Sequence, residues 1–501
     1  MLRETFTENG KVRGIPAADP RITAYKGIPF AAPPVGELRW RAPQPAKNWE
    51  GVLDCFKFAP ISMQEIPGED PNAFYSKEWH VDPEIPMSED CLYLNVWTPA
   101  KKADEKLPVM VWIFGGGMAN GYPAEMEFDG ERIARRGVIL VSVNYRVNSF
   151  GFLTHPELTE AAKETGEVAG NFGLLDQRAG IEWVKRNIAN FGGDPDNITV
   201  FGQSAGGRSS WAHVCSPMNK GLFKRAIPQS GAIADDFARY PTLEASHERG
   251  IKFLEKLGVS TIEEARKIDA KTLINKTLEC SREIRWSPVL DGQFLVMDPI
   301  DAFKVGAYND VAIMTGNTAG EGKMMVPTSV EGFENFVKRM YGDDAEYILE
   351  KANVKTDEDV LKAFDTPDFN RFEVGNKYVA WKNAKHGRTP IYCYRFNPEI
   401  PGDNAGSFHS SDLWFVFESL AKCWRPFVGK HYDLARQMCN YWTNFAKCGD
   451  PNGLDADGTP METWRPVTED DINVIYFGDT VKMEDCGPTE LMMHFMEQID
   501  K

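Results

Sequence analysis

Two stretches of this sequence are almost continuously apolar, and they limit most strongly the folds that the chain can adopt. Residues 108–114 (PVMVWIF) and 137–145 (GVILVSVNY) each have the length of one strand. Apolar runs of this length are typical of strands buried on both faces. Farther along, residues 171–191 repeat apolar side chains on one helical stripe and end at Gly192-Gly193. Strands that alternate with helices predict an α/β fold, in which helices flank a mostly parallel central sheet.

The remaining sequence continues this alternation. Asn9-Gly10 is the strongest dipeptide signal for a two-residue hairpin turn and predicts a small hairpin at the N-terminus. Residues 198–202 predict a further strand, and a helix is expected from Gly206 onwards. Later strands are expected at 313–316 and 391–396, and later helices at 412–420, 432–446 and 491–499.

The length of 501 residues alone suggests about three domains. Residues 235–310 and 324–390 are more polar and mostly helical in pattern, but they contain no Gly/Ser linker. We therefore expect a single domain over residues 1–501, with these two insertions forming a helical cap region.

Charge and cysteine content exclude several classes of protein. With 56 Lys and Arg against 73 Asp and Glu, the net charge of −17 disfavours nucleic acid and anionic membranes as partners. No run approaches 18 apolar residues, so no membrane span is expected. The polar start (MLRETFTENG) lacks a signal peptide's apolar core, and the nine cysteines form no CxxC pair. These features predict a cytoplasmic protein with free thiols and no zinc site, unless a signal peptide has been removed.

Gly202-Gln203-Ser204-Ala205-Gly206 is the first candidate for chemistry. Gly-x-Ser-x-Gly alone is a weak signal, and a spectator serine in a tight glycine turn is the alternative. Here an apolar strand leads into the motif, and small residues open a helix after it. This context is typical of a nucleophile elbow, a strained turn that exposes a serine hydroxyl. Ser204 is therefore the candidate nucleophile.

A serine nucleophile requires a base and donors for the oxyanion that forms on the attacked carbonyl. Phe114-Gly115-Gly116-Gly117 ends an apolar strand upstream of Ser204 and fits an HGGG-type loop with Phe in place of His. We expect the N–H groups of Gly116, Gly117 and Ala205 to form the oxyanion hole. A flexible glycine turn is the alternative.

Eight histidines are candidates for the base. His213 follows the serine too closely, His386 stands in a charged stretch, and His494 belongs to the final amphipathic helix. His409 lies in a loop that enters a helix, which suits a base presented at a sheet edge. His409 is therefore the preferred base, and His431 is the alternative.

The acid should lie between serine and histidine, as in the order typical of enzymes with a nucleophile elbow. Glu321 follows a predicted strand, so it would lie at the carboxyl end of that strand, where catalytic groups collect. Asp412 is the alternative acid, but it is only three residues from His409 and poorly placed to reach the far imidazole nitrogen.

With these residues, the chain resembles the type-B carboxylesterase and cholinesterase family of α/β-hydrolases over nearly its whole length. The resemblance implies an α/β-hydrolase fold with Ser204 as nucleophile, Glu321 as acid and His409 as base. It also implies two bracing ion pairs, Arg39 with Glu89 and Arg178 with Asp194. The matching segments are 25–34 (YKGIPFAAPP), 88–96 (SEDCLYLNV), 115–117 (GGG), 171–178 (NFGLLDQR), 190–195 (NFGGDP), 201–207 (FGQSAGG), 288–295 (PVLDGQFL) and 409–417.

The chain departs from this family in two places. The usual cysteine partner of Cys91 is missing from residues 58–64, which leaves Cys55 as a less favoured substitute and supports a reducing compartment. Gln203 stands where cholinesterases carry Glu, and an amide cannot hold a cationic substrate by its charge. Choline esters are therefore disfavoured. The family also contains inactive adhesion proteins that lack a triad, whereas all three triad residues are present here.

The resemblance predicts a serine hydrolase, a carboxylesterase that cleaves short-to-medium acyl or aryl esters through an acyl-enzyme. It implies no metal or organic cofactor and no partner other than a small-molecule ester. Feruloyl esters of plant cell walls are the second substrate class, and an idle binding or adhesion module is the alternative of another class. Trp286 and Trp414 would line the substrate pocket or lie in the core.

Overall fold

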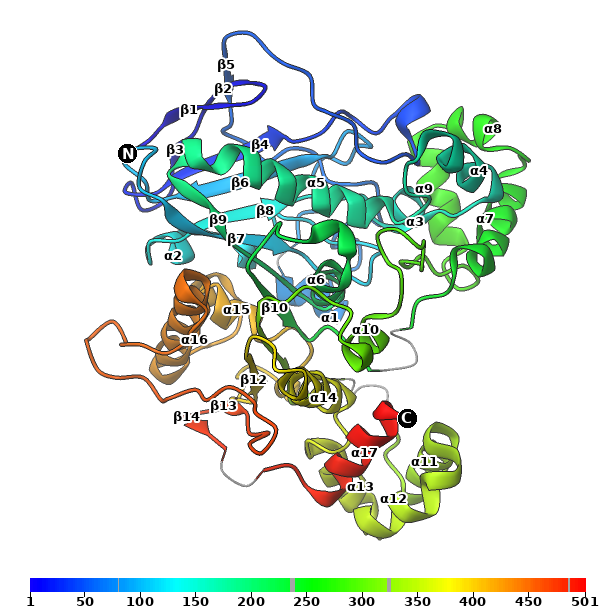
Figure 1. Ribbon diagram of the computed structural model, residues 1–501, viewed down its shortest axis with the longest axis vertical. Helices are drawn as coiled ribbons and strands as arrows, with labels where there is room; N and C mark the ends of the chain where they lie inside the picture. Colours follow the sequence, from blue (N-terminus) through cyan, green and yellow to red (C-terminus); the bar gives the residue numbers. More distant parts are fainter. Residues whose placement is uncertain (80, 235–238, 322–325, 485–486) are drawn as a thin grey trace.

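The computed structural model describes residues 1–79, 81–234, 239–321, 326–484 and 487–501. In this part of the chain, an 11-stranded sheet forms the centre of the molecule (Figure 1). From edge to edge its strands are β14 (Val481–Met483), β13 (Ile475–Phe477), β12 (Ile391–Phe396), β11 (Ala312–Thr318), β10 (Arg225–Gln229), β9 (Gly193–Gln203), β7 (Leu107–Ile113), β8 (Ile139–Val143), β6 (Tyr93–Thr98), β4 (Thr23–Pro29) and β3 (Ile15–Pro16).

The middle of the sheet is parallel and its edges are antiparallel. Every pairing from β8 through β7, β9, β10, β11 and β12 to β13 is parallel. The pairings of β14, β6, β4 and β3 with their neighbours are antiparallel. All five residues of β8 are buried, which confirms that the apolar runs are strands covered on both faces.

Helices cover both faces of the sheet. α5 (Phe172–Asn187) and α6 (Ala205–Cys215) pack on one face, and α2 (Glu131–Ala134) and α16 (Gly429–Cys448) pack on the other (Figure 1). The mostly parallel α/β architecture is thus the expected one. The other α-helices are α1 (Phe74–Trp79), α3 (Asn148–Phe152), α4 (Pro156–Thr165), α7 (Leu243–Leu257), α8 (Ile262–Arg266), α9 (Ala270–Glu279), α10 (Pro299–Val305), α11 (Val330–Tyr341), α12 (Ala345–Ala352), α13 (Asp357–Asp365), α14 (Arg371–Lys385), α15 (Leu413–Val416) and α17 (Glu490–Asp500).

Two expected elements differ in detail. The N-terminal hairpin joins β1 (Glu4–Thr7) and β2 (Gly10–Arg13), and β5 (Val52–Asp54) completes this small sheet. Thr7 pairs with Gly10, so the turn residues are 8 and 9, one position earlier than expected. The helix expected at 412–420 is limited to α15, because Glu418 adopts a positive φ of 50° that an α-helix cannot accommodate.

The two predicted insertions form separate helical groups. Helices α7, α8 and α9 lie beside α4 at the right of Figure 1, whereas α11, α12 and α13 lie beside α17 at the bottom. Residues 235–238, 324 and 325 of these insertions lie outside the described part of the chain. The structure therefore describes the helical character of both segments, while their role as a cap stays a prediction.

One of the two expected ion pairs is present. Arg39 binds Glu89 through two parallel hydrogen bonds of 2.6 and 2.7 Å, and both side chains are almost fully buried. The expected pair of Arg178 with Asp194 is wrong. Arg178 contacts Glu182 instead, at 2.9 Å, because the two lie one turn apart on α5.

The buried partner of Asp176, also on α5, is Arg146. These side chains are 2% and 0% exposed, and an Arg146 Nη2 to Asp176 Oδ1 distance of 2.7 Å joins them. Burial raises the pKa of Asp176 more than the charge and hydrogen bonds of Arg146 lower it. The pair fixes the segment that leads into α3 to α5, which packs on β9.

The eight cysteines in the described residues are free thiols, and Cys486 lies outside them. Cys91 is fully buried, and burial raises the pKa of its thiol above the ordinary range. Cys55 is buried as a separate free thiol and does not replace the missing partner. The side chain of Ser62 is within hydrogen-bonding reach of the Cys91 thiol, so Ser62 occupies the position from which a partner would bridge.

Replacing Ser62 with Cys should therefore restore a disulfide to Cys91 under oxidising conditions. The disulfide would close the loop between residues 62 and 91. Closing this loop is expected to stabilise the folded state by about 3 kcal/mol, because it restricts the unfolded chain. Thermal unfolding with and without reductant, together with peptide mapping of the bridge, measures the effect. Ser62→Ala is the control that removes the hydroxyl without adding a thiol. Two thiols that remain titratable after oxidation would contradict the expected geometry.

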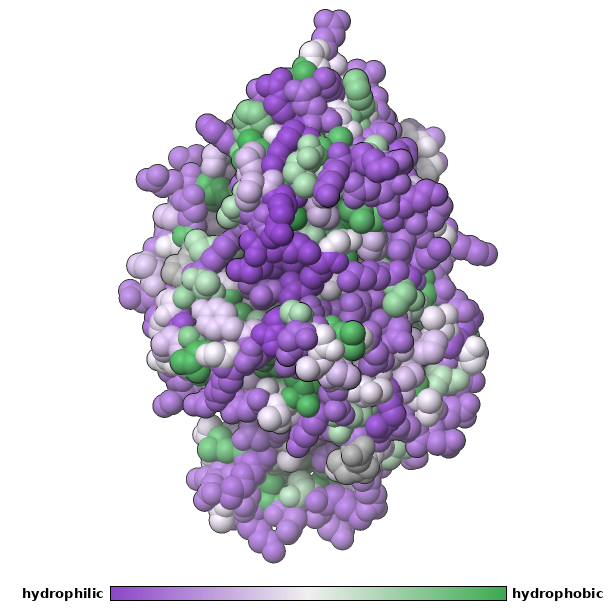
Figure 2. Space-filling view, turned by 90° about the vertical axis from the view of Figure 1, so that its left-hand side faces the viewer, coloured by the Kyte–Doolittle hydropathy of each residue, from purple (hydrophilic) through white to green (hydrophobic). Residues whose placement is uncertain are grey.

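The surface shown in Figure 2 is mostly hydrophilic, and its apolar residues form small, separate groups. Scattered apolar side chains of this kind are usual on a folded surface. Among the described helices, none combines the length and the apolar character needed to span a lipid bilayer.

Candidate active site

Ser204 lies in a sharp turn between β9 and α6. Its backbone has φ 57° and ψ −120°, a strained conformation for a residue with a side chain. A Cβ atom on Gly202 would lie 2.5 Å from the Ile113 carbonyl oxygen, and one on Gly206 would lie 2.0 Å from it. Both glycines of the motif are therefore required by close packing against β7, as a nucleophile elbow demands.

The structure brings Ser204, His409 and Glu321 together. The His409 Nε2 atom is 2.8 Å from Ser204 Oγ, and the His409 Nδ1 atom is 2.5 Å from Glu321 Oε2. The Glu321 side chain is 1% exposed and that of His409 is 26% exposed, so the imidazole reaches the surface of the cavity while the carboxylate is sealed behind it. This hydrogen-bonded chain can move a proton from the serine hydroxyl to the imidazole.

Two loops that are distant in sequence hold the acid and the histidine together. Glu321 comes shortly after β11, and its Oε1 atom accepts a hydrogen bond of 3.0 Å from the Thr318 N–H group. The Gly320 N–H group donates to the Ser407 carbonyl at 2.9 Å, which joins this loop to the loop carrying His409. A Cβ atom on Gly320 would lie 2.5 Å from the same carbonyl oxygen, so only glycine permits the approach.

The two titratable groups perturb each other in the direction that catalysis requires. Burial alone would raise the pKa of Glu321, but the charge and hydrogen bond of His409 outweigh it and leave that pKa below its ordinary value. Burial alone would lower the pKa of His409, but the charge and hydrogen bond of Glu321 outweigh it and leave that pKa raised. The pair therefore favours an ionised acid beside a basic imidazole.

The alternative residues lie elsewhere. Asp412 accepts hydrogen bonds from Tyr394 Oη at 3.0 Å and from Gln229 Nε2 at 3.4 Å, and burial raises its pKa to about 6. It does not hydrogen-bond the imidazole of His409. The alternative base, His431, accepts from the Val428 N–H group at 3.0 Å and donates from Nε2 to a backbone carbonyl. It therefore has a structural role at the start of α16.

The glycine loop after β7 faces Ser204 across one cavity. Gly116 and Gly117 adopt positive φ values of 101° and 65°, and both line this cavity with Ser204. Ala205 is the first residue of α6, so its N–H group has no acceptor within the helix. The described residues provide no acceptor for the N–H groups of Gly116, Gly117 or Ala205. These three donors are thus available to an oxyanion beside Ser204.

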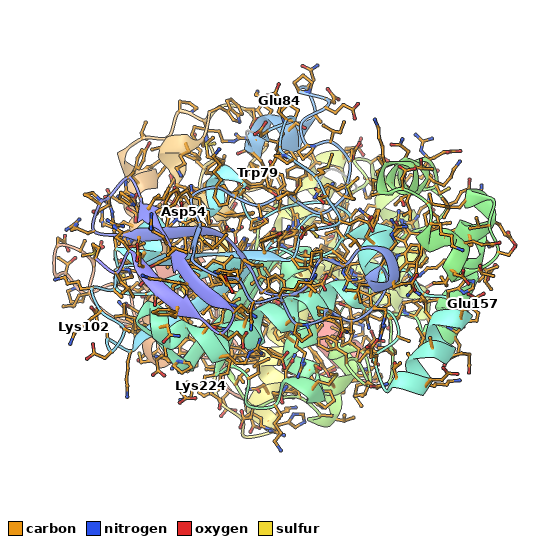
Figure 3. All side chains as sticks on the ribbon, turned by 90° about the horizontal axis from the view of Figure 1, so that it is seen from above. Asp54, Trp79, Glu84, Lys102, Glu157 and Lys224 are labelled. Atoms are coloured by element: carbon orange, nitrogen blue, oxygen red, sulfur yellow. The ribbon has the colours of Figure 1, made fainter. Side chains whose placement is uncertain are left out.

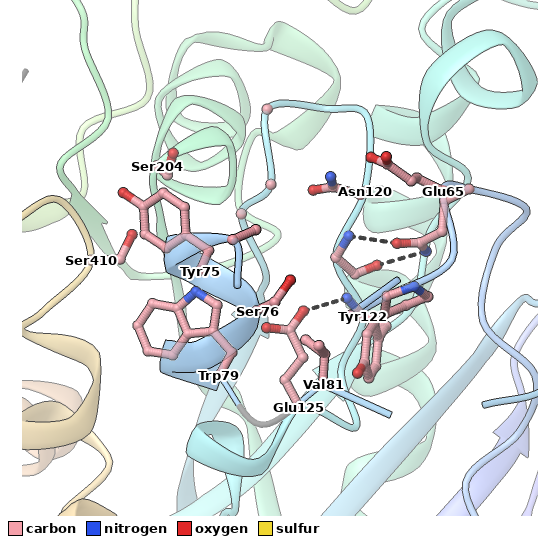
Figure 4. Close-up of a pocket in the computed structure, with 18 of the residues that line it drawn as sticks. Glu65, Tyr75, Ser76, Trp79, Val81, Asn120, Tyr122, Glu125, Ser204 and Ser410 are labelled. Atoms are coloured by element: carbon pink, nitrogen blue, oxygen red, sulfur yellow. Dashed lines mark hydrogen bonds between the residues drawn. The ribbon is translucent and has the colours of Figure 1, made fainter. Parts of the chain in front are cut away.

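The cavity that contains Ser204 and His409 has a volume of about 490 Å³ (Figure 4). Its aromatic lining is provided by Tyr75, Trp79, Tyr122 and Phe128. The rings of Tyr75 and Trp79 are stacked, with centroids 6.2 Å apart and planes within 8°. The aromatic lining is not predictable from sequence, because nothing in the spacing of Tyr75, Trp79 or Tyr122 indicates that they lie in one cavity with Ser204.

Helix α1, which carries Tyr75 and Trp79 of the aromatic lining, is anchored by a buried carboxylate. Glu78 on α1 forms an ion pair with Arg425, with Nη2 and Oε2 3.0 Å apart, and both side chains are 1% exposed. It also accepts hydrogen bonds of 3.2 Å from the indoles of Trp414 and Trp424. In the view from above, Glu84 lies at the edge of the molecule and Trp79 lies nearer its centre (Figure 3).

The two tryptophans considered from sequence are core residues. Trp414 is 1% exposed and bonds Glu78, while Trp286 packs edge-on against Phe253 with ring centroids 5.1 Å apart. The described lining of the cavity includes no residue of the two insertions. One insertion residue lies close to the triad, however, since the Phe372 ring centroid is 6.1 Å from that of His409.

Gln203 is buried directly before Ser204. Its Nε2 atom is 3.4 Å from His409 Nε2, and its residue lines the cavity. An uncharged amide therefore occupies this position. As for metals, no group of three His, Cys, Asp or Glu side chains in the described ranges is placed to hold an ion.

Comparison with known proteins gives a consistent result. The family model described as the carboxylesterase family matches residues 3–385 and 367–491. A para-nitrobenzyl esterase from Bacillus subtilis is 34% identical over 97% of this chain and 96% of its own length. A fumonisin B1 esterase from Sphingopyxis macrogoltabida is 34% identical over 89% of this chain and 82% of its own length.

A solved structure extends the likeness to three dimensions. The crystal structure of the carboxylesterase EST55 from Geobacillus stearothermophilus at pH 6.2 superposes with a TM-score of 0.81 and 31% identity. The alignment covers 99% of this chain and all of that chain. Sequence and fold agree over nearly the whole length, so this chain belongs to the carboxylesterase family of α/β-hydrolases and is a carboxylic-ester hydrolase.

Proposed function

We propose that this enzyme hydrolyses short-to-medium acyl and aryl esters through a covalent acyl-enzyme on Ser204. The single observation that carries the proposal is the continuous hydrogen-bonded chain that runs from Ser204 and His409, which line the cavity, to Glu321 behind them. A serine hydroxyl is a weak nucleophile by itself, and an adjacent oriented base is what activates it.

In the first half of the reaction, His409 Nε2 takes the proton of Ser204 as its oxygen attacks the ester carbonyl. Glu321 holds the imidazole in the required tautomer and stabilises its cation. The N–H groups of Gly116, Gly117 and Ala205 donate to the oxyanion of the tetrahedral intermediate. The C–O bond then breaks, and the alcohol leaves with the proton from His409.

In the second half, water attacks the acyl-enzyme. His409 takes a proton from that water, and the same three N–H groups stabilise the second oxyanion. Collapse of the intermediate returns the proton to Ser204 Oγ and releases the carboxylic acid. Apart from the ester and this water, every group that acts in the cycle belongs to the chain itself.

The volume and lining of the cavity support this substrate class. A volume of about 490 Å³ accepts an ester larger than an alkyl acetate, and four aromatic side chains favour aryl groups or short-to-medium apolar groups. The name of the para-nitrobenzyl esterase relative also supports aryl esters. Hydroxycinnamoyl esters, such as feruloyl esters, are the second candidate because the same aromatic lining suits them.

A panel of esters ranked by kcat/KM tests this substrate class. It should include p-nitrophenyl acetate, p-nitrophenyl butyrate, a long-chain p-nitrophenyl ester and methyl ferulate. We expect the butyrate to rank above the long-chain ester, because the cavity is too small for an extended acyl chain. If methyl ferulate ranks first, the feruloyl alternative replaces our proposal. Absence of hydrolysis across the panel would favour the binding-module alternative.

The pH dependence of the reaction should report the raised pKa of His409. The base must be neutral to accept the serine proton, and it is protonated below its pKa, so activity falls as the pH drops through that value. Because Glu321 raises the pKa, the acidic limb of kcat/KM for p-nitrophenyl butyrate should have its midpoint above the reference value of about 6.5. A midpoint below that value would contradict the strong coupling of His409 with Glu321.

A further inference from the structure

Gln64 is a buried amide that the proposed mechanism does not use, and it binds the end of the glycine loop. It is 2% exposed. Its Oε1 atom accepts a hydrogen bond of 2.8 Å from the Gly121 N–H group, and its Nε2 atom donates to the Gly121 carbonyl at 3.1 Å (Figure 4). The same Nε2 atom donates to the Ser62 carbonyl at 3.1 Å. Both N–H bonds of the amide are therefore used, which fixes its orientation.

Gly121 ends a loop that begins at Gly115 and closes on itself. The N–H groups of Ala119 and Asn120 both donate to the Gly116 carbonyl, at 3.0 and 3.1 Å. A Cβ atom on Gly121 would lie 2.5 Å from the Gly115 carbonyl oxygen, so the two ends of the loop are in close contact. A displacement of Gly121 would therefore also displace Gly115 and Gly116.

The backbone of this loop is strained and depends on contacts from outside it. Gly116, Gly117 and Met118 are consecutive and have positive φ values of 101°, 65° and 63°. A positive φ is costly for a residue with a side chain, and it persists only where the surroundings determine it. The Asn148 N–H group holds the middle of the loop by donating to the Met118 carbonyl at 2.7 Å, and Gln64 holds its end. Residues far from the loop in sequence thus maintain its conformation.

We propose that Gln64 is a positioning residue of the oxyanion hole. By binding both main-chain groups of Gly121, it holds the N–H groups of Gly116 and Gly117 where the oxyanion forms. This inference rests on the proposed ester hydrolysis at Ser204. Donors that are fixed before the reaction need not reorganise as charge develops, and this preorganisation is the source of their effect. An apolar side chain at position 64 would leave both main-chain groups of Gly121 unpaired, so the loop would relax away from this geometry.

Replacing Gln64 with Met tests the role. Methionine has nearly the length of glutamine and removes all three hydrogen bonds. We expect kcat for p-nitrophenyl butyrate to fall about 10- to 100-fold, because the oxyanion donors are displaced but remain present. KM should stay within about twofold of wild type, since the lost interaction acts only in the transition state.

A trifluoromethyl ketone reports on the oxyanion hole directly. The Ser204 oxygen adds to the carbonyl carbon of pentyl trifluoromethyl ketone, the serine proton passes to His409, and the ketone oxygen becomes an oxyanion. Pentyl methyl ketone has the same chain but binds as an unreacted ketone. We expect Gln64→Met to raise the inhibition constant of the fluoroketone by the factor that it removes from kcat, and that of the methyl ketone by less than about twofold.

The matched control is Gln44→Met. Gln44 Nε2 donates at 3.0 Å to the Ala42 carbonyl, two positions earlier, as Gln64 does to Ser62, but Gln44 lies outside the described lining of the cavity. Its loss should leave kcat and both inhibition constants unchanged. An inhibition constant does not depend on the amount of folded enzyme, so a merely structural role would move neither constant. If Gln64→Met does not fold, Gln64→Glu, which keeps the acceptor for Gly121, gives the same comparison.

The outcomes separate this inference from the proposed function. An unchanged kcat in the Gln64 variant overturns the positioning role alone, as does a lower kcat with wild-type affinity for the fluoroketone. An equal loss of affinity for both ketones also overturns it, because ordinary substrate binding would then be impaired. Failure of wild type to hydrolyse p-nitrophenyl butyrate and to bind the fluoroketone overturns the proposed function, and the role of Gln64 with it.

Discussion

Replacing Ser204 with Ala is expected to lower kcat for p-nitrophenyl butyrate by about 10⁴-fold or more. The hydroxyl oxygen is the atom that would form the acyl bond, and without it the histidine and acid activate nothing. Residues of such a triad act as a unit, so losing the nucleophile costs about as much as losing the whole set. Initial rates and a burst measurement on purified protein give the two kcat values.

Ser210→Ala is the matched control for this experiment. Ser210 is a buried serine on α6, the helix that follows Ser204. Its hydroxyl donates to the Gly206 carbonyl at 2.9 Å instead of facing the cavity. Its loss should leave kcat nearly unchanged and lower stability only slightly. Should Ser204→Ala retain activity close to that of Ser210→Ala, another nucleophile must carry the reaction.

Replacing Glu321 with Gln should lower kcat by about 10⁴-fold. The amide keeps the shape of the side chain, but it removes the charge that stabilises the imidazolium and allows the wrong tautomer of His409. Because Glu321 also raises the pKa of His409, the acidic limb of the residual activity should move to lower pH. A pH series of kcat/KM on the variant measures both effects.

Asp412→Asn serves as the comparison for the acid. Asp412 accepts from Tyr394 and Gln229, so an amide there disturbs a buried network without touching the imidazole. Its effect on kcat should be far smaller than that of Glu321→Gln. A larger loss in Asp412→Asn than in Glu321→Gln would overturn the assignment of the acid.

The parts of the molecule that could be predicted from sequence are those with local signals. Runs of apolar residues predicted β7 and β8, because a strand buried on both faces has no polar alternation. The glycines around Ser204 predicted the turn, since their close approach to β7 leaves no room for a Cβ atom. Glu321 and His409 were predicted from chain order and loop context, and the structure places His409 against Ser204 and Glu321 against His409.

Other features depend on contacts that no local pattern records. β10 was missed because it is short and contains Pro228, a residue that argues against a central strand, although it pairs with β9 and β11. The predicted partner of Arg178 was wrong because its side chain is directed along α5 to Glu182, one turn away. The aromatic and acidic side chains that line the cavity were not predicted, because packing against residues far along the chain determines their positions.

The anchoring of α1 limits how the enzyme can be recombined with its relatives. Tyr75 and Trp79 line the active-site cavity from a short helix, yet Glu78 on that helix is held by Arg425, 347 positions away. A chimera that took residues 64–81 alone from a relative without a carboxylate at position 78 would leave the buried guanidinium of Arg425 without its Glu78 partner and would destabilise the fold. Substrate preference in this scaffold is therefore inherited in two pieces of chain, and a productive exchange of the cavity wall must transfer the Arg425 segment with it.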